Sequence, residues 1–418
     1  MLKIISPSKN LIKFFLALKL NLSKPQKAHA LNVMEALIMC ESKKTISNLN
    51  RLLCNATDQS AMSDFFTYSP WDNNSLRYNT IRYLIRWALE QSQKQMFLPQ
   101  IFISLDDSLA KKPKESKHFE PVDWYFDANG QRRLGHSLSF LTCHLKIGNY
   151  SIPIDLRIYL KARIVRRLNR KYSGKRRLKF KTKTVLAQEI LQELTLLLPN
   201  GFPVYILFDS WYAGKKIIRF CRREGWHVIC ALKSNRKFNG KKLSRTARHI
   251  RNKRFTRIAV NSADSVAYYW VCVREGRING LDEDVQVFIS KRHRRDKGPE
   301  LFLCTDTTLS AKQALTFYTN RWAVEVDYLY LKTRLGFEDF RLRSYDGIAK
   351  FSQLVFLTLQ YLHWRMYEES DSQLKRITDV IALHRSQQWQ ATLVQFGQEV
   401  LKRQNVEIPL GDFLAKVA

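Results

Sequence analysis

The amino-acid sequence predicts an α/β protein in which a core of strands and helices is flanked by helical regions at both ends. Three observations support this class. Residues 1 to 97 carry apolar side chains at helical spacing, for example Leu31, Met34 and Leu37. Short apolar runs typical of strands begin at Ile101, and helical spacing returns at Leu309. The 418 residues, 45% of them apolar, are enough to bury a large core.

The segment from 98 to 345 contains the predicted core. Its first strand is Ile101 to Leu105, and a β-hairpin turning at Gly148-Asn149 follows. The hairpin strands are residues 140–147 and 150–159, and the later elements are a helix at 185–198, a strand at 203–208, a helix at 215–223 and a strand at 226–232. This order of three strands, helix, strand, helix and strand fits a ribonuclease H-like fold.

Two further regions complete the predicted organisation. Residues from about 233 to 300 form a β-rich insertion, and the strand-like runs are 258–260, 267–273, 285–289 and, just beyond it, 301–304. A long amphipathic helix runs from Leu309 to about Leu335, where Gly336 can end it. Residues 346 to 418 form a helical C-terminal region.

The charge of the chain indicates a polyanionic partner. Seventy Lys and Arg residues outnumber 37 Asp and Glu residues, which gives a formal charge of +33 and a pI near 10.0. Because such a chain repels itself without a polyanion nearby, nucleic acid is the expected partner. The basic stretches 161–183 and 233–257 are expected to follow a DNA backbone, and the N-terminal helices are a candidate for sequence recognition. A ribosomal or membrane-surface protein is the alternative, but no clear membrane-spanning segment is evident.

The cysteines and the first residues predict a reducing compartment. The seven cysteines form an odd number without a C-x-x-C pair, and several lie in apolar runs, so we expect buried free thiols and a cytoplasmic protein. The apolar segment from Asn10 to Leu22 is interrupted by Lys13 and Lys19, so we expect an amphipathic helix there rather than a signal peptide.

One face of the helix that starts at Leu309 carries four polar side chains. Tyr318, Arg321, Glu325 and Lys332 are separated by three, four and seven residues. At about 100° per residue, these spacings place the four side chains within roughly 60° of one another. An exposed face with weak Arg–Glu helix pairs is the alternative explanation.

Acidic residues follow two of the predicted strands. Asp106 and Asp107 come after the first strand, and Asp209 follows the strand at 203–208. Asp is disfavoured inside strands, and each of these residues could instead belong to a turn or a helix cap. Three acids at positions that suit one fold, counting Glu325, favour a shared site.

The four helix residues resemble the DDE transposases of bacterial insertion sequences, in the branch with a Y-(2)-R-(3)-E-(6)-K signature. Tyr318, Arg321, Glu325 and Lys332 match this signature at every spacing, and Trp322 is a residue often found beside the Arg in that branch. The resemblance covers about residues 98 to 345.

The first acidic motif departs from that pattern. It reads Asp106-Asp107-Ser108, whereas the family has Thr after its Asp. We favour Asp107 as the catalytic acid because it directly precedes the hydroxyl residue, and Asp106 is the alternative. The first 97 residues carry no motif that matches the family.

The resemblance implies metal-dependent phosphoryl transfer on double-stranded DNA. Asp107, Asp209 and Glu325 are expected to hold two Mg²⁺ or Mn²⁺ ions, because carboxylate oxygens suit these cations. The expected DNA contacts are Tyr318, Arg321, Trp322 and Lys332. Such an enzyme cuts at the ends of its mobile element and joins the 3′-OH ends to target DNA. Two ends suggest a homodimer on DNA, and the setting is the bacterial cytoplasm, in association with the nucleoid.

Several alternatives remain open. Tyr268, Tyr269 and Trp270 could stack on an unpaired base, although an ordinary strand core explains them too. His136 has no second His at metal-ligand spacing, so we expect a structural role for it. The rival functions are a ribonuclease H-like nuclease that never joins strands and an inactive DNA-binding regulator derived from a transposase.

Overall fold

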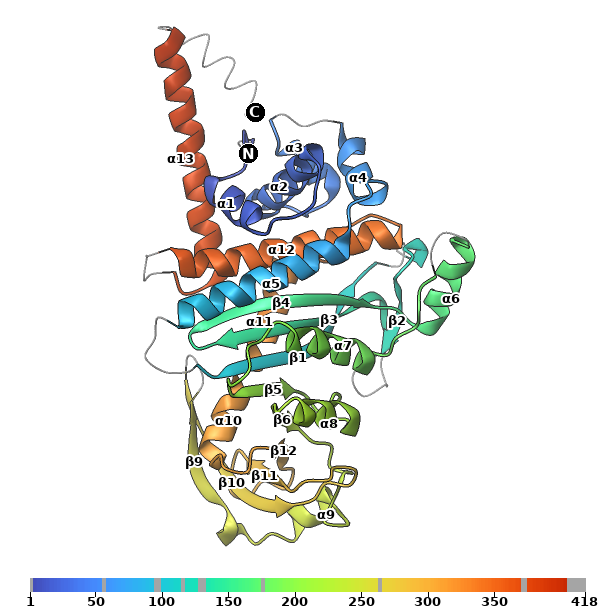
Figure 1. Cartoon of the computed structure of the whole chain (residues 1–418), viewed down its shortest axis with the longest axis vertical. Helices are drawn as coiled ribbons and strands as arrows, with labels where there is room; N and C mark the ends of the chain where they lie inside the picture. Colours follow the sequence, from blue (N-terminus) through green and yellow to red (C-terminus); the bar gives the residue numbers. More distant parts are fainter. Residues whose placement is uncertain are drawn as a thin grey trace.

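The computed structural model describes residues 3–54, 58–93, 99–113, 117–126, 133–173, 177–261, 265–369 and 374–403. Helices gather at one end of the molecule and a large mixed sheet occupies the rest (Figure 1). The long helix α13 projects from the helical end, and strands β9, β10 and β11 lie at the opposite end (Figure 1).

Five helices lie among the described residues of the first hundred. They are α1 (Lys9–Ala17), α2 (Lys24–Met39), α3 (Ile46–Arg51), α4 (Gln59–Thr67) and α5 (Asn73–Ser92). α2 begins with a capping box, in which Ser23 and Gln26 satisfy each other's backbone N–H groups. α1 confirms the predicted amphipathic helix, because Leu11, Phe14 and Phe15 are buried on one of its faces.

The central sheet has ten strands. They are β1 (Ile101–Lys111), β2 (Asp123–Phe126), β3 (Arg133–Ile147), β4 (Tyr150–Tyr159), β5 (Val204–Phe208), β6 (His227–Ala231), β9 (Thr256–Asn261), β10 (Val266–Gly276), β11 (Val285–Lys291) and β12 (Glu300–Cys304). Their order is β2-β3-β1-β5-β6-β12-β11-β10-β9, and β4 pairs with β3. β1, β5 and β6 are parallel to one another, and the other pairs are antiparallel. Two short strands, β7 (Lys237–Phe238) and β8 (Lys241–Lys242), form a separate pair.

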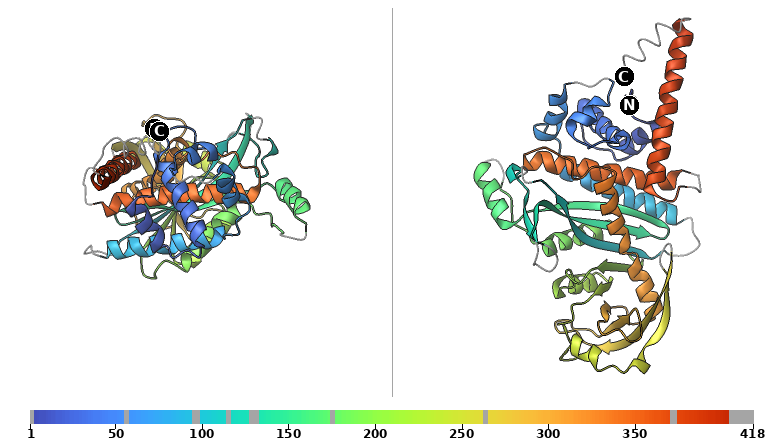
Figure 2. Two further views of the ribbon diagram at one scale, coloured as in Figure 1. Left: turned by 90° about the horizontal axis from the view of Figure 1, so that it is seen from above. Right: turned by 180° about the vertical axis from the view of Figure 1, so that it is seen from behind.

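Eight helices follow the first strands in the described part of the chain. They are α6 (Ala162–Lys171), α7 (Lys183–Thr195), α8 (Lys215–Arg223), α9 (Leu243–Arg248), α10 (Ala311–Thr319), α11 (Trp322–Thr333), α12 (Tyr345–Glu368) and α13 (Ile377–Arg403). A 3-10 turn also spans Asn252–Arg254. α12 lies between α2 and the strand β4 (Figure 2), and most of its side chains are buried. α10 and α11 run along the sheet on the face seen from behind (Figure 2).

The structure corrects three of the predicted elements. The first strand does not end at Leu105 but continues to Lys111, because Asp106 and Asp107 stay paired with Thr142 and Leu141 of β3. The strand β3 begins seven residues earlier than predicted, at Arg133, and β2 was not predicted. The basic stretch 161–183 contains a helix, α6, which buries Ile164, Val165 and Leu168.

Other predictions are confirmed. The hairpin of β3 and β4 turns at Gly148-Asn149, and Gly148 has the positive φ of 57° that favours glycine. The predicted strand at 203–208 corresponds to β5, and the predicted helix 215–223 is α8. Gly336 follows α11 with φ of 63°, and a Cβ there would lie 2.7 Å from Lys44 Cβ.

The strands between 256 and 304 lie in the same sheet as β1, β5 and β6. β12 pairs with β6 through Phe302↔Ala231 and Cys304↔Ile229, and β11, β10 and β9 follow in turn. The hydrogen-bonded ladder therefore continues without interruption from the centre of the molecule to the end formed by β9.

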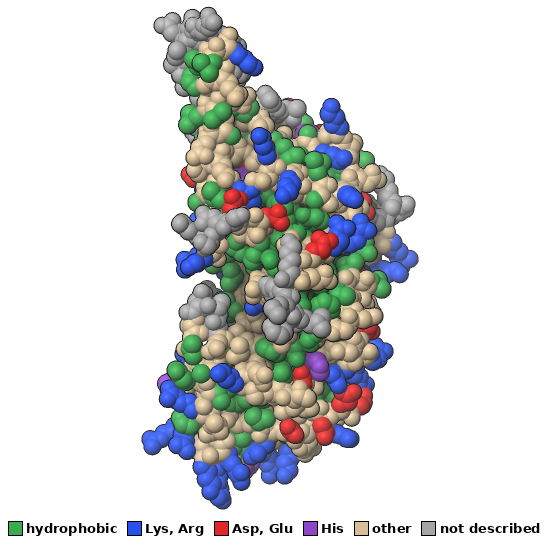
Figure 3. All heavy atoms as spheres, turned by 60° about the vertical axis from the view of Figure 1, so that its left-hand side comes forward, with side chains coloured by type: hydrophobic (Ala, Val, Ile, Leu, Met, Phe, Trp, Pro, Cys, Tyr) green, Lys and Arg blue, Asp and Glu red, His purple; other side chains and the backbone are tan. Residues whose placement is uncertain are grey.

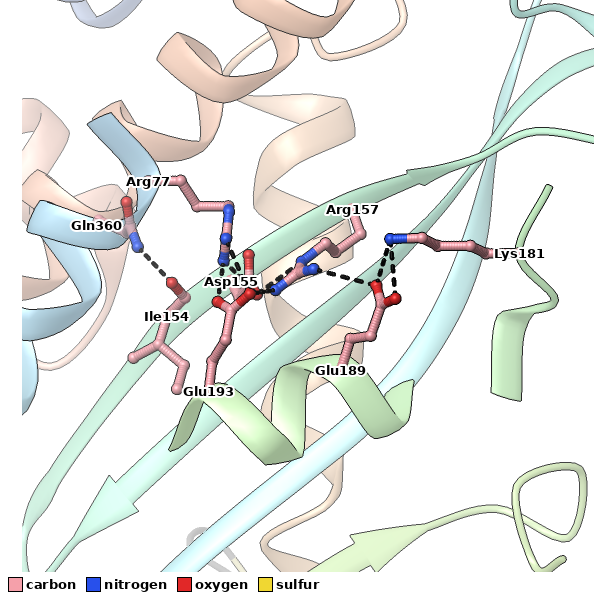
Figure 4. A network of polar contacts seen from close by, with 8 residues as sticks. All are labelled: Arg77, Ile154, Asp155, Arg157, Lys181, Glu189, Glu193 and Gln360. Atoms are coloured by element: carbon pink, nitrogen blue, oxygen red, sulfur yellow. Dashed lines mark hydrogen bonds and ion pairs between the residues drawn. The ribbon is translucent and has the colours of Figure 1, made fainter. Parts of the chain in front are cut away.

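A network of ion pairs joins α5, β4 and α7 on one face of the sheet (Figure 4). Arg77 of α5 donates to Asp155 Oδ2 at 3.0 Å and to Glu193 Oε2 at 2.8 Å. Arg157 donates to the same Asp155 oxygen at 3.0 Å, and Glu189 links the network to Lys181 at 2.8 Å. Three cations face three carboxylates, so a largely buried cluster is balanced in charge.

Basic side chains gather at the end of the molecule opposite the helices (Figure 3). This end is formed by α9, β9 and the segments beside them, and its exposed cations are Lys237, Lys241, Lys242, Arg245, Arg248, Arg251, Lys253, Arg254 and Arg257. Such a surface is suited to a polyanion.

Six of the seven cysteines are buried thiols outside any disulfide, as predicted, and Cys54 is half-buried. Over the residues that the structure describes, no helix combines the length and the apolar content needed to cross a bilayer.

Candidate active site

Successive side chains of β1 point to opposite faces of the sheet, and this alternation separates Asp106 from Asp107. On one face, alternate residues of β1 contact α10, α11 and the turn between these helices. These contacts are Ser104 Oγ to the Asn320 carbonyl oxygen at 3.4 Å, Asp106 Oδ2 to Arg321 Nη1 at 3.2 Å and Ser108 Oγ to Lys332 Nζ at 2.8 Å. Asp106 therefore lies on the face that carries the residues of the predicted helix signature.

Asp107 lies on the other face of the sheet. Its Oδ1 accepts a hydrogen bond from Tyr212 Oη at 2.7 Å, and its Oδ2 is paired with Lys183 Nζ, at the start of α7. Burial and the nearby Asp107 carboxylate raise the pKa of the Tyr212 phenol, so this phenol remains a donor. The structure thus brings Asp107 to Tyr212 and Lys183, and it does not bring Asp107 to Glu325.

Asp106 and Asp209 follow paired residues of two parallel strands. The β1–β5 ladder ends with Leu105 opposite Phe208, so Asp106 and Asp209 both stand at the point where the pairing of these two strands ends. Asp209 Oδ1 accepts from the Trp211 N–H at 2.9 Å, which fixes the turn after β5. Burial raises the pKa of Asp106 to about 7, and the negative charge of Asp209 acts in the same direction.

Arg321 joins Asp106 to Glu325. Its Nη1 lies 3.2 Å from Asp106 Oδ2, and its Nη2 donates to Glu325 Oε1 at 2.6 Å. Burial acts to lower the pKa of this guanidinium, but Tyr318 and the two carboxylates raise it above its ordinary value. One face of β1 and the first turn of α11 therefore bring two acids and their shared cation together.

The predicted single helix from Leu309 to Leu335 is two helices in the structure, which is a correction. α10 ends at Thr319 and α11 begins at Trp322. Between them the backbone tightens, because the Arg321 N–H donates to the Tyr318 carbonyl three residues earlier, at 3.0 Å. The chain nevertheless keeps nearly the same direction, so Arg321 and Glu325 stay on one side.

Tyr318 and Lys332 lie on either side of this pair. Tyr318 Oη donates to the Phe208 carbonyl oxygen at 3.3 Å, directly before Asp209, and burial raises the pKa of the phenol. Lys332 donates to Ser108, which lies two residues beyond Asp106 on β1, and burial lowers the pKa of the Lys332 ammonium group. Both side chains therefore contact the strands whose ends carry the acids.

Two hollows meet at the turn between α10 and α11. One has a volume of about 620 Å³ and is lined by Asp209, Tyr269 and Phe302 among others. The other, of about 1110 Å³, reaches His144 and opens on the side that Figure 3 brings forward. Arg321 and Trp322 line both, and Trp322 is 61% exposed. Of the predicted DNA contacts, Tyr318, Arg321 and Trp322 thus line the hollows, and Lys332 lines neither of them.

The donor set is suited to a hard divalent cation, although it is not gathered around one point. Among the described residues, no three His, Cys, Asp or Glu side chains form a compact metal-binding group. Asp106 and Asp209 are two carboxylates at the end of the β1–β5 pairing, and a cation would relieve their mutual repulsion. Glu325 completes a set of oxygen ligands, and Arg321 lies between it and Asp106.

Two further sequence candidates have ring contacts of their own. His136 packs against Trp124 with ring centroids 4.3 Å apart, which agrees with a structural role. Tyr268, Tyr269 and Trp270 lie on β10, and each carries an Arg over its ring. These Arg residues are Arg257, Arg292 and Arg294, at 4.3, 5.1 and 5.1 Å from the ring centroids.

Sequence reasoning missed a buried group on α11. Asp327 Oδ2 lies 2.6 Å from His144 Nδ1, and His363 Nε2 lies 3.3 Å from the other oxygen. Burial acts to raise the pKa of Asp327, but the two His side chains hold it below its ordinary value. This group anchors α11, and therefore Glu325, to β3 and α12. Its members are far apart in sequence, so no spacing could reveal them.

Comparison with known families places these residues in context. Residues 17–261 match a family described as DDE superfamily endonuclease, and residues 181–360 match the transposase DDE domain. No curated protein matches the chain in sequence. The two matched segments together include Asp106, Asp209 and Glu325. Because the first match spans more than half of the 418 residues, the chain belongs to the DDE superfamily of endonucleases.

Proposed function

We propose that this endonuclease is a DNA transposase that cuts at the ends of its mobile element and joins the freed 3′-OH ends to target DNA. The observation that carries the proposal is the placement of Asp106, Asp209 and Glu325 around Arg321, where the pairing of β1 with β5 ends. The match to the transposase DDE domain and the mixed sheet, which is consistent with a ribonuclease H-like core, support it further.

We assign the first acid to Asp106 instead of Asp107. Asp106 shares a face of β1 with Arg321 and Lys332, whereas Asp107 is bonded to Tyr212 on the other face. Asp107 then has a positioning role, because Tyr212 belongs to the loop that begins at Asp209.

Asp106, Asp209 and Glu325 would hold two Mg²⁺ or Mn²⁺ ions. When bound, such ions activate water and stabilise the charge on the leaving 3′ oxygen. Asp106 and Asp209 stand on adjacent strands of a rigid sheet, and Glu325 stands on a helix anchored through Asp327. This placement holds the reacting groups in line, which is how phosphoryl transfer is accelerated without a nucleophilic side chain.

The cations around the acids are suited to DNA phosphates. Arg321 offers a planar fork for two phosphate oxygens, and Lys332 offers a point charge at the next contact along β1. Trp322, which is exposed between the two hollows, offers an aromatic surface beside them. The basic end around β9 extends the cationic surface, and two element ends call for two copies of the chain.

The test is strand cleavage and strand joining on DNA that carries the element's own ends, with Mg²⁺ or Mn²⁺. We expect the wild type to perform both steps, and Asp209→Ala and Glu325→Ala to lose both. Asp282→Ala, which removes an acid that is 77% exposed, is the matched control and should keep both. Cleavage without joining would indicate a nuclease, and DNA binding without either step would indicate a regulator.

A further inference from the structure

The Arg321 guanidinium is the direct partner of two of the three proposed metal ligands. Its Nη1 lies 3.2 Å from Asp106 Oδ2, and its Nη2 lies 2.6 Å from Glu325 Oε1. The side chains of Arg321, Asp106 and Glu325 are 17%, 19% and 31% exposed, so water screens these contacts only partly. The remaining donor, Arg321 Nε, is buried without a hydrogen-bond partner in the described part of the chain. The guanidinium is therefore held mainly by the two acids, and its central carbon also lies 5.7 Å from the centre of the Tyr318 ring.

Both oxygens of the Asp106 carboxylate already have a partner. Its Oδ1 already accepts the Asp107 N–H at 2.8 Å, and its Oδ2 faces Arg321. A metal ion that uses Oδ2 and approaches Glu325 must compete with the guanidinium for the same oxygens. A cation at this distance lowers the affinity of a carboxylate for a second cation by about tenfold or more.

The guanidinium also has a second possible partner outside the acid pair. Arg321 lines both hollows that meet at the α10–α11 turn, next to the exposed Trp322, so a phosphate lying there can reach it. Phosphate oxygens match the planar fork as well as two carboxylates do.

We infer that Arg321 is an internal counter-ion, which occupies the acids until a DNA phosphate draws it away and leaves Asp106 and Glu325 to the metal ions. DNA and metal then bind cooperatively, and each raises the affinity for the other by the same factor. This inference rests on the proposed function, since it uses the proposed metal ligands. It adds an order of assembly: DNA first, tight metal binding second.

The experiment measures Mn²⁺ binding to the full chain by the electron paramagnetic resonance signal of free Mn²⁺, without DNA. We expect Arg321→Ala to bind Mn²⁺ about tenfold more tightly than the wild type. Arg321→Lys, which keeps the charge but lacks the fork, should lie between them. Arg219→Ala is the matched control: it also removes an Arg that is paired with an acid, but that acid is Asp282 and not a proposed metal ligand, so the affinity should change by less than about threefold.

A second measurement adds DNA. A pre-cleaved duplex of the element end should raise the Mn²⁺ affinity of the wild type about tenfold and leave that of Arg321→Ala unchanged, after subtraction of binding to the duplex alone. Equal Mn²⁺ affinity of wild type and Arg321→Ala, or no effect of DNA on the wild type, overturns the inference. If Asp209→Ala and Glu325→Ala bind Mn²⁺ as tightly as the wild type, the proposed metal site itself is wrong.

Discussion

Substituting the two adjacent aspartates separately tests which face of β1 carries the chemistry. Asp106→Asn removes a charge from the face shared with Arg321 and Glu325, and Asp107→Asn removes one from the face shared with Tyr212. Both changes keep the size of the side chain. Any difference between the two variants therefore reports the position of the carboxylate rather than packing.

The expected rate losses differ because Asp106 would bind the metal ions directly, whereas Asp107 acts through Tyr212, Lys183 and the loop after Asp209. A lost metal ligand removes several kcal/mol of transition-state stabilisation, which corresponds to a rate loss of about 10³-fold or more for Asp106→Asn. Asp107→Asn weakens the contacts to Tyr212 and Lys183 and loosens the loop after Asp209, so we expect a loss of about 10- to 100-fold. Leaving those buried donors poorly paired also costs about 1–3 kcal/mol of stability.

The assay is the single-turnover cleavage rate of a labelled element-end duplex with Mg²⁺, together with the thermal unfolding of each variant. Tyr212→Phe, which removes only the hydroxyl donor to Asp107, should resemble Asp107→Asn and differ from Asp106→Asn. The assignment is refuted if Asp107→Asn abolishes cleavage while Asp106→Asn stays within about tenfold of the wild type.

Three further predictions concern the frame of the site. Asp155→Ala removes the most buried carboxylate beside Arg77 and Arg157, which then share only Glu193, and should lower the free energy of unfolding by about 3–5 kcal/mol in urea denaturation; a loss below about 1 kcal/mol contradicts this. Burial acts to raise the pKa of Glu120, but the hydrogen bonds to this carboxylate keep its pKa below the ordinary value. The stability that Glu120 contributes is therefore complete above the unfolded pKa, and it is lost as the pH falls through the folded pKa. The Tm of wild type should therefore fall more steeply than that of Glu120→Gln between about pH 6 and about pH 3, and parallel curves would disprove the effect. Lys332→Ala should reduce the salt dependence of DNA affinity by a slope of about one in fluorescence anisotropy, and an unchanged slope would exclude a phosphate contact.

The sequence was sufficient where one local pattern decides the structure. The apolar run before Asp209 predicts β5, and the structure ends that strand at Phe208. The spacing of Arg321 and Glu325 predicts a common side, and the two side chains are hydrogen-bonded. In both cases the information lies within a few neighbouring residues.

The sequence was insufficient where contacts between residues far apart in the chain determine the structure. Residues 101 to 105 are buried on both faces of the sheet, so the apolar pattern does not reveal which face receives α11. That information resides in the contact of Asp106 with Arg321, 215 residues away. The continuation of β1 through the two acids likewise depends on pairing with Thr142 and Leu141 of β3. The sequence did not predict the tight turn at Arg321, because the helical spacing of the side chains is almost unchanged across this turn.

The unbroken ladder from β5 to β9 sets the distance between these two strands. Five strand spacings separate these two strands, which amounts to about 24 Å across the sheet at about 4.8 Å per spacing. A DNA strand rises about 3.4 Å per nucleotide, so the same span corresponds to about seven base pairs. A duplex that lies across the strands would meet the cations near β9 about seven base pairs from the phosphate at Asp209, and the sheet would act as a molecular ruler for the position of the cut.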